Sequence, residues 1–398
     1  MSHSSGLDFS LQGYTFDLPE ERIAQHPAPE RSASRLMVLN RSDGTTKSGT
    51  FADILAYLPE KALLVANNSR VIPARVWGKR TGGGRVEMLL LTPLPLLRHA
   101  SEGENSLFPG WKTAEAEVLF RPAKKVRAGE IVSLAENFAV ELLEHGPYGR
   151  CRAQLAWRGD LQELLMRCGS IPLPPYIKRQ KPLPGCEDPG GPGRGKERRE
   201  WGTDEERYQT VYARKDKAGS VAAPTAGLHF TEDMRAALLN SGREWAEVTL
   251  YVGYGTFSPV RSQDIRRHAM HAEFVEVPPE TAASIARAKA EKRPVIAVGT
   301  TSARSLEGAF AAQNPEYAAC SSPCPDLLPF SGWTDIFLYP GKRFHVLNGL
   351  ITNFHLPQSS LLMMVAALAG RERILSAYRQ AVAENYRFFS YGDSMLIL

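Results

Sequence analysis

Six short runs of polar residues, punctuated by glycine or alanine, hold the side chains whose types and spacing could do chemistry. The runs span residues 222–230, 252–257, 268–273, 298–304, 352–357 and 389–394. They carry histidines, which can move protons near neutral pH, and threonine, asparagine and arginine side chains, which can bind polar or anionic groups. Several runs follow expected strands, and open α/β sheets bind ligands beyond the carboxyl ends of their strands. The runs therefore predict a polar ligand site at such an edge.

The run 298–304 reads Val-Gly-Thr-Thr-Ser-Ala-Arg and is typical of a strand-to-helix turn. Its free backbone N–H groups and hydroxyls would suit an anion. Each run also has a plainer interpretation: Thr300 to Ser302 can be a helix cap, His229 a core histidine, and Asp393 a turn residue beside Gly392. The common signatures of nucleotide-binding loops, nucleophile elbows and zinc proteases are absent from the sequence.

Residues 71–157 are expected to form an all-β module. Six runs have β-branched or alternating apolar positions, and glycine-containing turns separate them. The runs are 71–79, 85–92, 115–120, 131–134, 138–143 and 150–157. Six short strands without helices between them predict a small barrel. Residues 94–112 show no periodicity and are expected to be a loop.

The remaining sequence alternates between strand and helix patterns. Helices are expected over 231–240, 279–291, 302–311, 359–369 and 372–386, and strands over 247–252 and 294–298. Thr231 is the expected N-cap of the first helix. Such alternation is typical of an α/β layer domain. The fold class is therefore an α/β main domain, residues 1–70 and 158–398, with an inserted barrel-like domain, residues 71–157.

The composition is that of a soluble globular protein, with 43% apolar and 23% charged residues. The longest apolar run, 361–369, is too short to span a membrane, and residues 1–8 do not resemble a secretory signal. Five scattered cysteines fit a reducing cytoplasm, and no spacing suggests a metal site.

A segment rich in proline, glycine and basic residues occupies the middle of the chain. Between residues 182 and 195, nine of fourteen positions are proline or glycine. Such a segment is either a solvated loop or an arm that contacts RNA. The net charge of +5 permits a polyanionic partner but does not require one.

Together and in order, these runs resemble the S-adenosylmethionine:tRNA ribosyltransferase-isomerases of queuosine biosynthesis. The resemblance covers almost the whole chain. It includes Phe16-Asp17-Leu18-Pro19, Ile23-Ala24-Gln25-His26-Pro27, and residues 67–75, 171–177 and 207–213 in addition to the six runs. The family usually has Asn-Asp-Thr-Arg where this chain has Asn67-Asn68-Ser69-Arg70, so a carboxylate is missing at Asn68. The loops 94–112, 183–201 and 315–328 look longer than is usual.

The resemblance implies an enzyme that consumes S-adenosylmethionine as a ribosyl donor. The acceptor is a tRNA that carries 7-aminomethyl-7-deazaguanine at the wobble position, and the products are epoxyqueuosine-tRNA, adenine and methionine. The resemblance implies no metal and no separate cofactor, and a monomer is expected. Two other readings are a conventional S-adenosylmethionine-dependent RNA methyltransferase, and a non-catalytic RNA-binding protein.

Within this resemblance, His229 is the first choice for general base or acid, because the reaction needs a proton taken from the ribose and another given to adenine. Further candidates for this proton transfer are His271, Glu273 and His355. The methionine carboxylate is assigned to Thr300, Thr301 and Arg304, and adenine to stacking on Tyr254 or Phe354. Other residues expected to bind S-adenosylmethionine are Thr225, Thr256, Asn353 and Asp393. Contacts with tRNA phosphates or the deazaguanine are assigned to Arg31, Arg35, Arg70 and Arg75.

Overall fold

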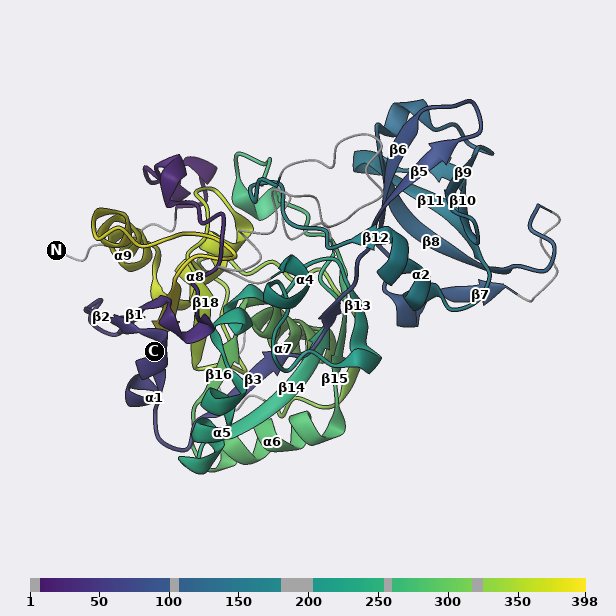
Figure 1. Cartoon of the computed structure of the whole chain (residues 1–398). Helices are drawn as coiled ribbons and strands as arrows, with labels where there is room; N and C mark the ends of the chain where they lie inside the picture. The colour runs from purple at the N-terminus through teal and green to yellow at the C-terminus, as the bar shows by residue number, and fades with distance from the viewer. Residues whose placement is uncertain (1–7, 101–106, 180–202, 254–259, 317–324) are drawn as a thin grey trace.

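The computed structural model describes residues 8–100, 107–179, 203–253, 260–316 and 325–398. Figure 1 shows two parts: a larger α/β part that contains both termini, and a β part that stands to one side of it. The chain enters the β part after the short strand β4 (Arg70–Val71) and leaves it through the helix α2 (Leu161–Cys168). The predicted fold class is confirmed. The domain boundaries at residues 70/71 and 157/158 stay a prediction.

The β part is a closed barrel of six antiparallel strands. They are β5 (Arg75–Arg80), β6 (Arg85–Leu90), β8 (Lys112–Arg121), β9 (Ile131–Ala135), β10 (Phe138–His145) and β11 (Arg150–Trp157). Pairing between β8 and β11 closes the ring. Alternate residues such as Val118, Val140 and Leu155 point into one core, as the period of two along a strand requires. The six strands match the six that the sequence predicts.

The region 94–112 is more structured than the sequence suggests. It contains the 3-10 helix η5 (Leu94–Leu96) and the strand β7 (Arg98–Ala100), which pairs with β8. Helix α2 also packs on the barrel core through Leu161, Leu164 and Leu165, and the strand β12 (Gly169–Ser170) pairs with β5. The prediction of a loop over 94–112 is therefore wrong for η5 and β7. The strand β7 is held by its pairing with β8 and not by a periodic sequence of its own.

The α/β part contains a mixed sheet of nine strands in the order β17-β15-β14-β3-β16-β18-β19-β1-β2. Their bounds are β1 (Arg35–Leu39), β2 (Thr46–Thr50), β3 (Leu63–Asn67), β14 (Glu244–Leu250), β15 (Glu273–Val277), β16 (Val295–Val298), β17 (Phe330–Thr334), β18 (Gly349–Asn353) and β19 (Ser394–Ile397). The four central strands, β14, β3, β16 and β18, are parallel. Their carboxyl ends therefore meet at one edge. The strand β13 (Ala218–Ser220) pairs with β4 close to that edge.

Helices cover both faces of the sheet. The helices α6 (Pro279–Ala290), α7 (Thr300–Gln313), α8 (Ser360–Ala369) and α9 (Arg371–Ala383) pack on one face, and α1 (Ile54–Tyr57) and α5 (Glu232–Asn240) on the other. A short helix, α4 (Asp204–Arg207), follows the connection from the barrel. As predicted, Thr231 caps α5, and its hydroxyl accepts a hydrogen bond from the Met234 backbone N–H.

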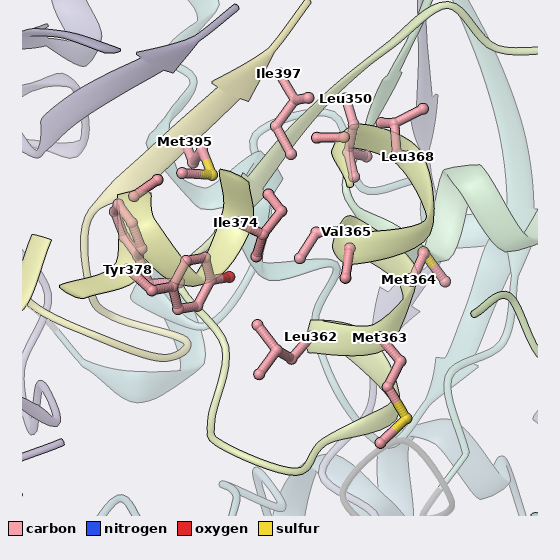
Figure 2. Close-up of a cluster of buried hydrophobic side chains, with 14 of the residues drawn as sticks. Leu350, Leu362, Met363, Met364, Val365, Leu368, Ile374, Tyr378, Met395 and Ile397 are labelled. Carbon is pink, nitrogen blue, oxygen red and sulfur yellow. The ribbon is translucent and has the colours of Figure 1, made fainter. Parts of the chain in front are cut away.

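Figure 2 shows how α8 and α9 are fixed to the sheet. Leu362 and Val365 of α8 meet Ile374 and Tyr378 of α9, over Met395 of strand β19, and all five side chains are buried. Burying each such side chain contributes about 1.5–3 kcal/mol. The site-bearing segment that precedes α8 is thereby anchored to a rigid layer.

Candidate active site

A cavity of about 360 Å³ lies at the carboxyl ends of the central parallel strands. Val252 follows β14, Gly299 follows β16, and Thr352 and Asn353 end β18, and all four line it. A polar site at this edge is what the sequence predicts. The other lining residues are Pro175, Tyr176, 222–226, Val260, Thr300, Thr301, 355–361, Phe389 and Ser390. Of the predicted ligand residues, the cavity therefore brings together Thr225, Thr300, Thr301, Asn353 and His355.

The N-terminus of α7 opens directly into this cavity. Gly299, with φ of 91°, is the residue before the helix, and its left-handed backbone favours glycine. The first N–H groups of a helix have no acceptor inside the helix, and the helix dipole makes this end positive. The Thr301 hydroxyl is buried and has no hydrogen-bond partner among the described residues. This corner therefore has the chemistry to bind an anion.

A chain of buried side chains leads away from the cavity wall. The Thr225 hydroxyl donates to Asn353 Oδ1 over 3.1 Å, and Asn353 Nδ2 donates to His229 Nε2 over 3.1 Å. With Nε2 accepting, Nδ1 of the ring carries the proton and donates to the Ser34 hydroxyl over 2.7 Å. The chain fixes both the orientation of the Asn353 amide and the tautomer of His229. Ser34 is a residue that the sequence reasoning missed.

His229 is deeply buried, behind Asn353. Burial, assisted by the cationic Arg387 and Arg31, lowers the pKa of His229 from 6.5 to about 3. Its ring packs against Phe51, with the centroids 5.0 Å apart. The imidazole is therefore neutral at physiological pH and reaches the cavity through Asn353.

His355 lines the cavity itself and is the one imidazole among the described lining residues. Its Nε2 is 2.7 Å from the Thr352 hydroxyl, and its backbone N–H donates to the Tyr378 hydroxyl over 3.1 Å. Burial lowers the pKa of His355 to about 3. A neutral imidazole whose ring is held on one side is suited to exchange a proton with a bound molecule on the other.

The aromatic wall of the cavity is made by Tyr176 and Phe389, whose ring centroids are 4.0 Å apart. The Tyr176 hydroxyl is hydrogen-bonded to the Ser390 hydroxyl. Both residues lie in runs that resemble the family, but no sequence pattern distinguishes them from the other aromatic residues. The predicted Tyr254 and Thr256 lie outside the described residues.

Phe354 and Asp393 do not face the cavity in this structure. The Phe354 ring is fully buried against Tyr378, Tyr386 and Phe388, so neither of its faces is open for stacking on adenine. Asp393 accepts the backbone N–H groups of Arg35 and Arg387 over 3.0 and 2.8 Å. Phe354 turns away from the cavity because neighbouring residues at the end of strand β18 point to opposite sides, and Asn353 points toward the cavity.

Glu273 and Arg304 form a buried ion pair away from the cavity. Both side chains are no more than 3% exposed, and Glu273 also accepts the Gly253 backbone N–H over 3.0 Å. Arg304 belongs to the second turn of α7. Its Nη1 is engaged by Glu273, whereas its Nε and Nη2 are buried without a hydrogen-bond partner among the described residues. The pair ties α7 to strand β15 and to the end of β14.

His271 lies close to the charges of Arg150, Glu273, Glu117 and Arg261. Burial lowers its pKa first, and Arg150 and Arg261 lower it further, whereas the two carboxylates raise it. These neighbours place His271 beside the barrel and not in the cavity that His355 lines. The structure therefore separates the proposed proton-transfer residues into two groups.

The four predicted tRNA-binding arginines are spread over two regions. Arg31 donates to the carbonyl groups of Leu228 and Glu206, and Arg35 stacks over the Tyr386 ring at 3.7 Å. Arg70 belongs to β4, whereas Arg75 of β5 donates to the Leu173 carbonyl group over 3.2 Å. Contacts within the protein thus occupy at least part of Arg31, Arg35 and Arg75.

Asn68, where the family usually has an acid, is buried between two strands. Its amide donates to Glu247 over 3.0 Å and accepts from the Thr249 hydroxyl over 2.7 Å. It thereby joins β3 to β14 behind the cavity. Asn68 does not line the cavity. Its amide, which stands where the family usually has a carboxylate, makes hydrogen bonds that hold the two strands together.

Over the described ranges, no helix is long and apolar enough to cross a membrane. Within the same residues, no three His, Cys, Asp or Glu side chains gather as a metal site would require.

The sequence model of a family described as "Queuosine biosynthesis protein" matches residues 11–397. The chain belongs to this family. Similar proteins are the S-adenosylmethionine:tRNA ribosyltransferase-isomerases of Nitratidesulfovibrio vulgaris (strain DP4), 54% identical over 99% of both chains, and of Oleidesulfovibrio alaskensis, 53% identical over 100% of this chain and 95% of that one. The protein of the same name from Pelotomaculum thermopropionicum is 45% identical over 98% of this chain and all of that one.

A solved structure of S-adenosylmethionine tRNA ribosyltransferase from Thermotoga maritima is 30% identical and covers 97% of this chain and 100% of that one, with a TM-score of 0.49. The family model and the 54% identical relative confirm the family that the sequence motifs resemble, and the chain is an enzyme of queuosine biosynthesis.

Proposed function

We propose that the chain transfers and isomerises the ribosyl moiety of S-adenosylmethionine onto 7-aminomethyl-7-deazaguanine at the wobble position of tRNA. Epoxyqueuosine-tRNA, adenine and methionine are the products. Its relatives carry the name of this activity. The observation that carries the proposal is one cavity that joins the α7 N-terminus, an aromatic wall and a neutral histidine.

The methionine carboxylate of the donor binds at the α7 N-terminus in this proposal. Backbone N–H groups of the first helical turn would donate to it, as would the Thr301 hydroxyl, which has no partner among the residues that the structure describes. Thr300 lies beside them on the cavity wall. Arg304 is not needed for this contact, because it is paired with Glu273. Adenine would stack against Tyr176 or Phe389, which replace Phe354 in that role.

We assign proton transfer to His355, supported by the hydrogen-bonded side chains that end at Asn353. The sulfonium acidifies the ribose carbon beside sulfur, and His355, neutral because of its lowered pKa, would take that proton. A proton held on such a weak base is readily passed on, and the departing adenine nitrogen accepts it. Loss of adenine and cleavage of the bond between the ring oxygen and the carbon next to the deprotonated one would open the ribose to an aldehyde with a carbon–carbon double bond beside the sulfonium. The wobble amine would add to that double bond and release a proton. The carbon beside sulfur would then close the five-membered carbon ring onto the aldehyde, and the alkoxide so formed would displace methionine to leave the epoxide.

His229 is a positioning residue in this scheme. It accepts a hydrogen bond from Asn353 and so turns the Asn353 amide oxygen toward Thr225. Asn353 and Thr225 line the cavity, where they would orient the ribose hydroxyls or adenine. The hydrogen bond from His229 to Ser34 selects the tautomer that makes this possible.

The experiment that tests the function is product analysis. The full chain is incubated with S-adenosylmethionine and a tRNA that carries the aminomethyl-deazaguanine, and free adenine, methionine and the wobble nucleoside are quantified by mass spectrometry. We expect adenine and methionine in equal amounts, only with that tRNA. S-adenosylhomocysteine instead would indicate a methyltransferase, and RNA binding without turnover would indicate a binding protein.

We also propose that the enzyme works in the cytoplasm, where tRNA is found, and as a monomer. The cavity and the hydrogen-bonded chain behind it are built from one chain. Light scattering at working concentrations checks the monomer, for which a mass near 43.9 kDa is expected.

A further inference from the structure

A second cavity, also of about 360 Å³, lies between the barrel and the α/β part. The α/β part contributes Tyr251, Gly253, 272–274 and Trp333, and the barrel side contributes 91–93, Glu117 and Arg150. None of the residues to which we assign the ribosyl transfer lines it. The two parts of the chain thus enclose a space that the proposed function leaves unused.

Three aromatic residues form the α/β wall of this second cavity. The backbone N–H of Tyr251 donates to Phe274, and Phe274 is paired with Trp333 across strands β15 and β17. The rings follow one another, with centroids 6.5 Å apart from Tyr251 to Phe274 and 5.5 Å from Phe274 to Trp333. Tyr251 is buried, whereas Trp333 is 59% exposed. Phe274 and Trp333 meet edge to face, with an interplanar angle of 77°, so the three rings do not form one plane. The exposed Trp333 ring at the end of the row is the one on which a planar group can stack.

Charged groups form the opposite wall. Arg150 and Glu117 of the barrel lie 3.2 Å apart and both line the cavity. His271 lies within the electrostatic influence of Arg150, Glu117, Glu273 and Arg261. Arginine side chains attract the phosphates of a nucleic acid, and a carboxylate can accept hydrogen bonds from the amino group of a base. The wall therefore has the chemistry to bind a nucleotide of single-stranded RNA whose base stacks on the aromatic row.

The second cavity adjoins the first. Val252 lines the first cavity and Gly253 lines the second, and consecutive Cα atoms are about 3.8 Å apart. The Glu273 carboxylate, which accepts the Gly253 N–H, fixes this dividing strand end. Two pockets on either side of one strand end lie at a separation that neighbouring nucleotides of one RNA strand can span.

We propose that the second cavity binds an unpaired nucleobase of the tRNA anticodon loop, next to the base that is delivered to the first cavity, and that Trp333 is its stacking partner. The proposal rests on the proposed function, because it takes tRNA as the substrate. In this proposal, the junction between the barrel and the α/β part binds the nucleotide next to the modified one.

The test compares Trp333→Ala with Trp77→Ala, since Trp77 is also exposed, at 40%, but lies on the barrel strand β5 and does not line the cavity. The probe is an anticodon stem-loop RNA that carries the aminomethyl-deazaguanine, with two further versions that lack the base on one side of it or on the other. Binding to the full chain is measured by fluorescence anisotropy. Trp333→Phe keeps an aromatic ring and controls for folding.

We expect Trp333→Ala to raise the Kd for the intact RNA by about tenfold, the usual loss when one stacking side chain is removed, and Trp77→Ala to change it by less than about twofold. For one of the two abasic RNAs, Trp333→Ala should add no further loss, because the stacked base is already missing. Trp333→Phe should recover most of the affinity.

Two results would overturn the proposal: unchanged affinity of Trp333→Ala for the intact RNA, or equal losses with all three RNAs. Adenine release by the wild-type chain is measured in parallel. If the wild type binds the RNA with the expected pattern but releases no adenine, the proposed function fails and the base pocket stands. If adenine is released but the binding pattern is absent, the proposed function stands and the base pocket fails.

Discussion

At the scale of single residues, the Thr301 hydroxyl is buried at the α7 N-terminus and has no hydrogen-bond partner in the part of the chain that the structure describes. A buried hydroxyl without a hydrogen bond lowers the stability of the fold. A threonine at this position is explained if a bound ligand supplies the missing hydrogen-bond partner. In the proposed function that ligand is the carboxylate of S-adenosylmethionine.

Thr301→Val should therefore raise the KM for S-adenosylmethionine by about tenfold, because a hydrogen bond to a charged group contributes about 1.5–3 kcal/mol. The melting temperature should stay the same or rise, since no bond is lost in the free protein. Steady-state kinetics and thermal denaturation measure the two effects. Ser305→Ala, which loses a hydroxyl bonded to the Thr301 carbonyl group, is the control and should leave the KM unchanged.

Ser34→Ala removes the acceptor of the His229 Nδ1 proton. An unsatisfied buried donor costs about 1–3 kcal/mol of folding free energy, and a displaced Asn353 should lower kcat by about tenfold. Denaturant unfolding and turnover assays measure both. Thr281→Val loses a comparable buried bond, from Thr281 to the Glu247 carbonyl group, and should cost stability alone. Equal kcat values for the two variants would contradict the positioning role.

Acid should weaken the fold through His355 and His229. Each has a pKa of about 3 when folded and 6.5 as its ordinary value. Below pH 6.5 the unfolded chain binds protons that the folded chain excludes, so stability is full above pH 6.5 and falls as the pH falls toward 3. Each group contributes a slope of about 1.4 kcal/mol per pH unit. Urea unfolding at pH 7, 6 and 5 should show a shallower decline for His355→Gln than for the wild type.

At the scale of elements, the buried Glu273–Arg304 pair joins strand β15 to helix α7. Removing one partner of such a pair leaves a buried charge, whereas removing both leaves none. The Gly253 N–H contact makes the same pair a support for the strand end that separates the two cavities.

Arg304→Met should destabilise the chain by about 3–5 kcal/mol, and the double variant Glu273→Gln with Arg304→Met should recover part of that loss. Denaturant titration of the wild type, both single variants and the double variant gives the coupling energy. Additive losses in the double variant would show that the two side chains act independently.

At the scale of the whole molecule, the barrel is closed on itself but is not complete without α2. Leu161, Leu164 and Leu165 of this helix are part of the barrel core. The proposed boundary at residue 157 therefore cuts between a barrel strand and a helix that covers it.

A fragment of residues 71–172 should unfold cooperatively by circular dichroism, whereas a fragment of residues 71–157 should expose the surface that α2 covers and melt at lower temperature or not fold. Equal melting of the two fragments would support 157 as the end of the inserted domain. The unfolding of the full chain serves as the reference.

The sequence by itself determined the local elements and the family. Strand and helix patterns are local, so the six barrel strands, α5 with its Thr231 cap, and the turn at Gly299 could be predicted from their own residues. The buried strands β3 and β18 and the edge strand β7 could not, because their partners and not their periodicity define them.

Only the tertiary structure decided which polar runs share a cavity. His355 and Thr301 line one space, whereas Glu273 faces another, although all three lie in runs of the same kind. Successive residues at the end of β18 point to opposite sides, so Asn353 lines the cavity and Phe354 lies in the core. After the end of β14, the chain passes between the two cavities, so Val252 lines one and Gly253 the other. Long-range packing across the sheet fixes that choice, as it does for Ser34, which lies 195 positions from the histidine that it orients.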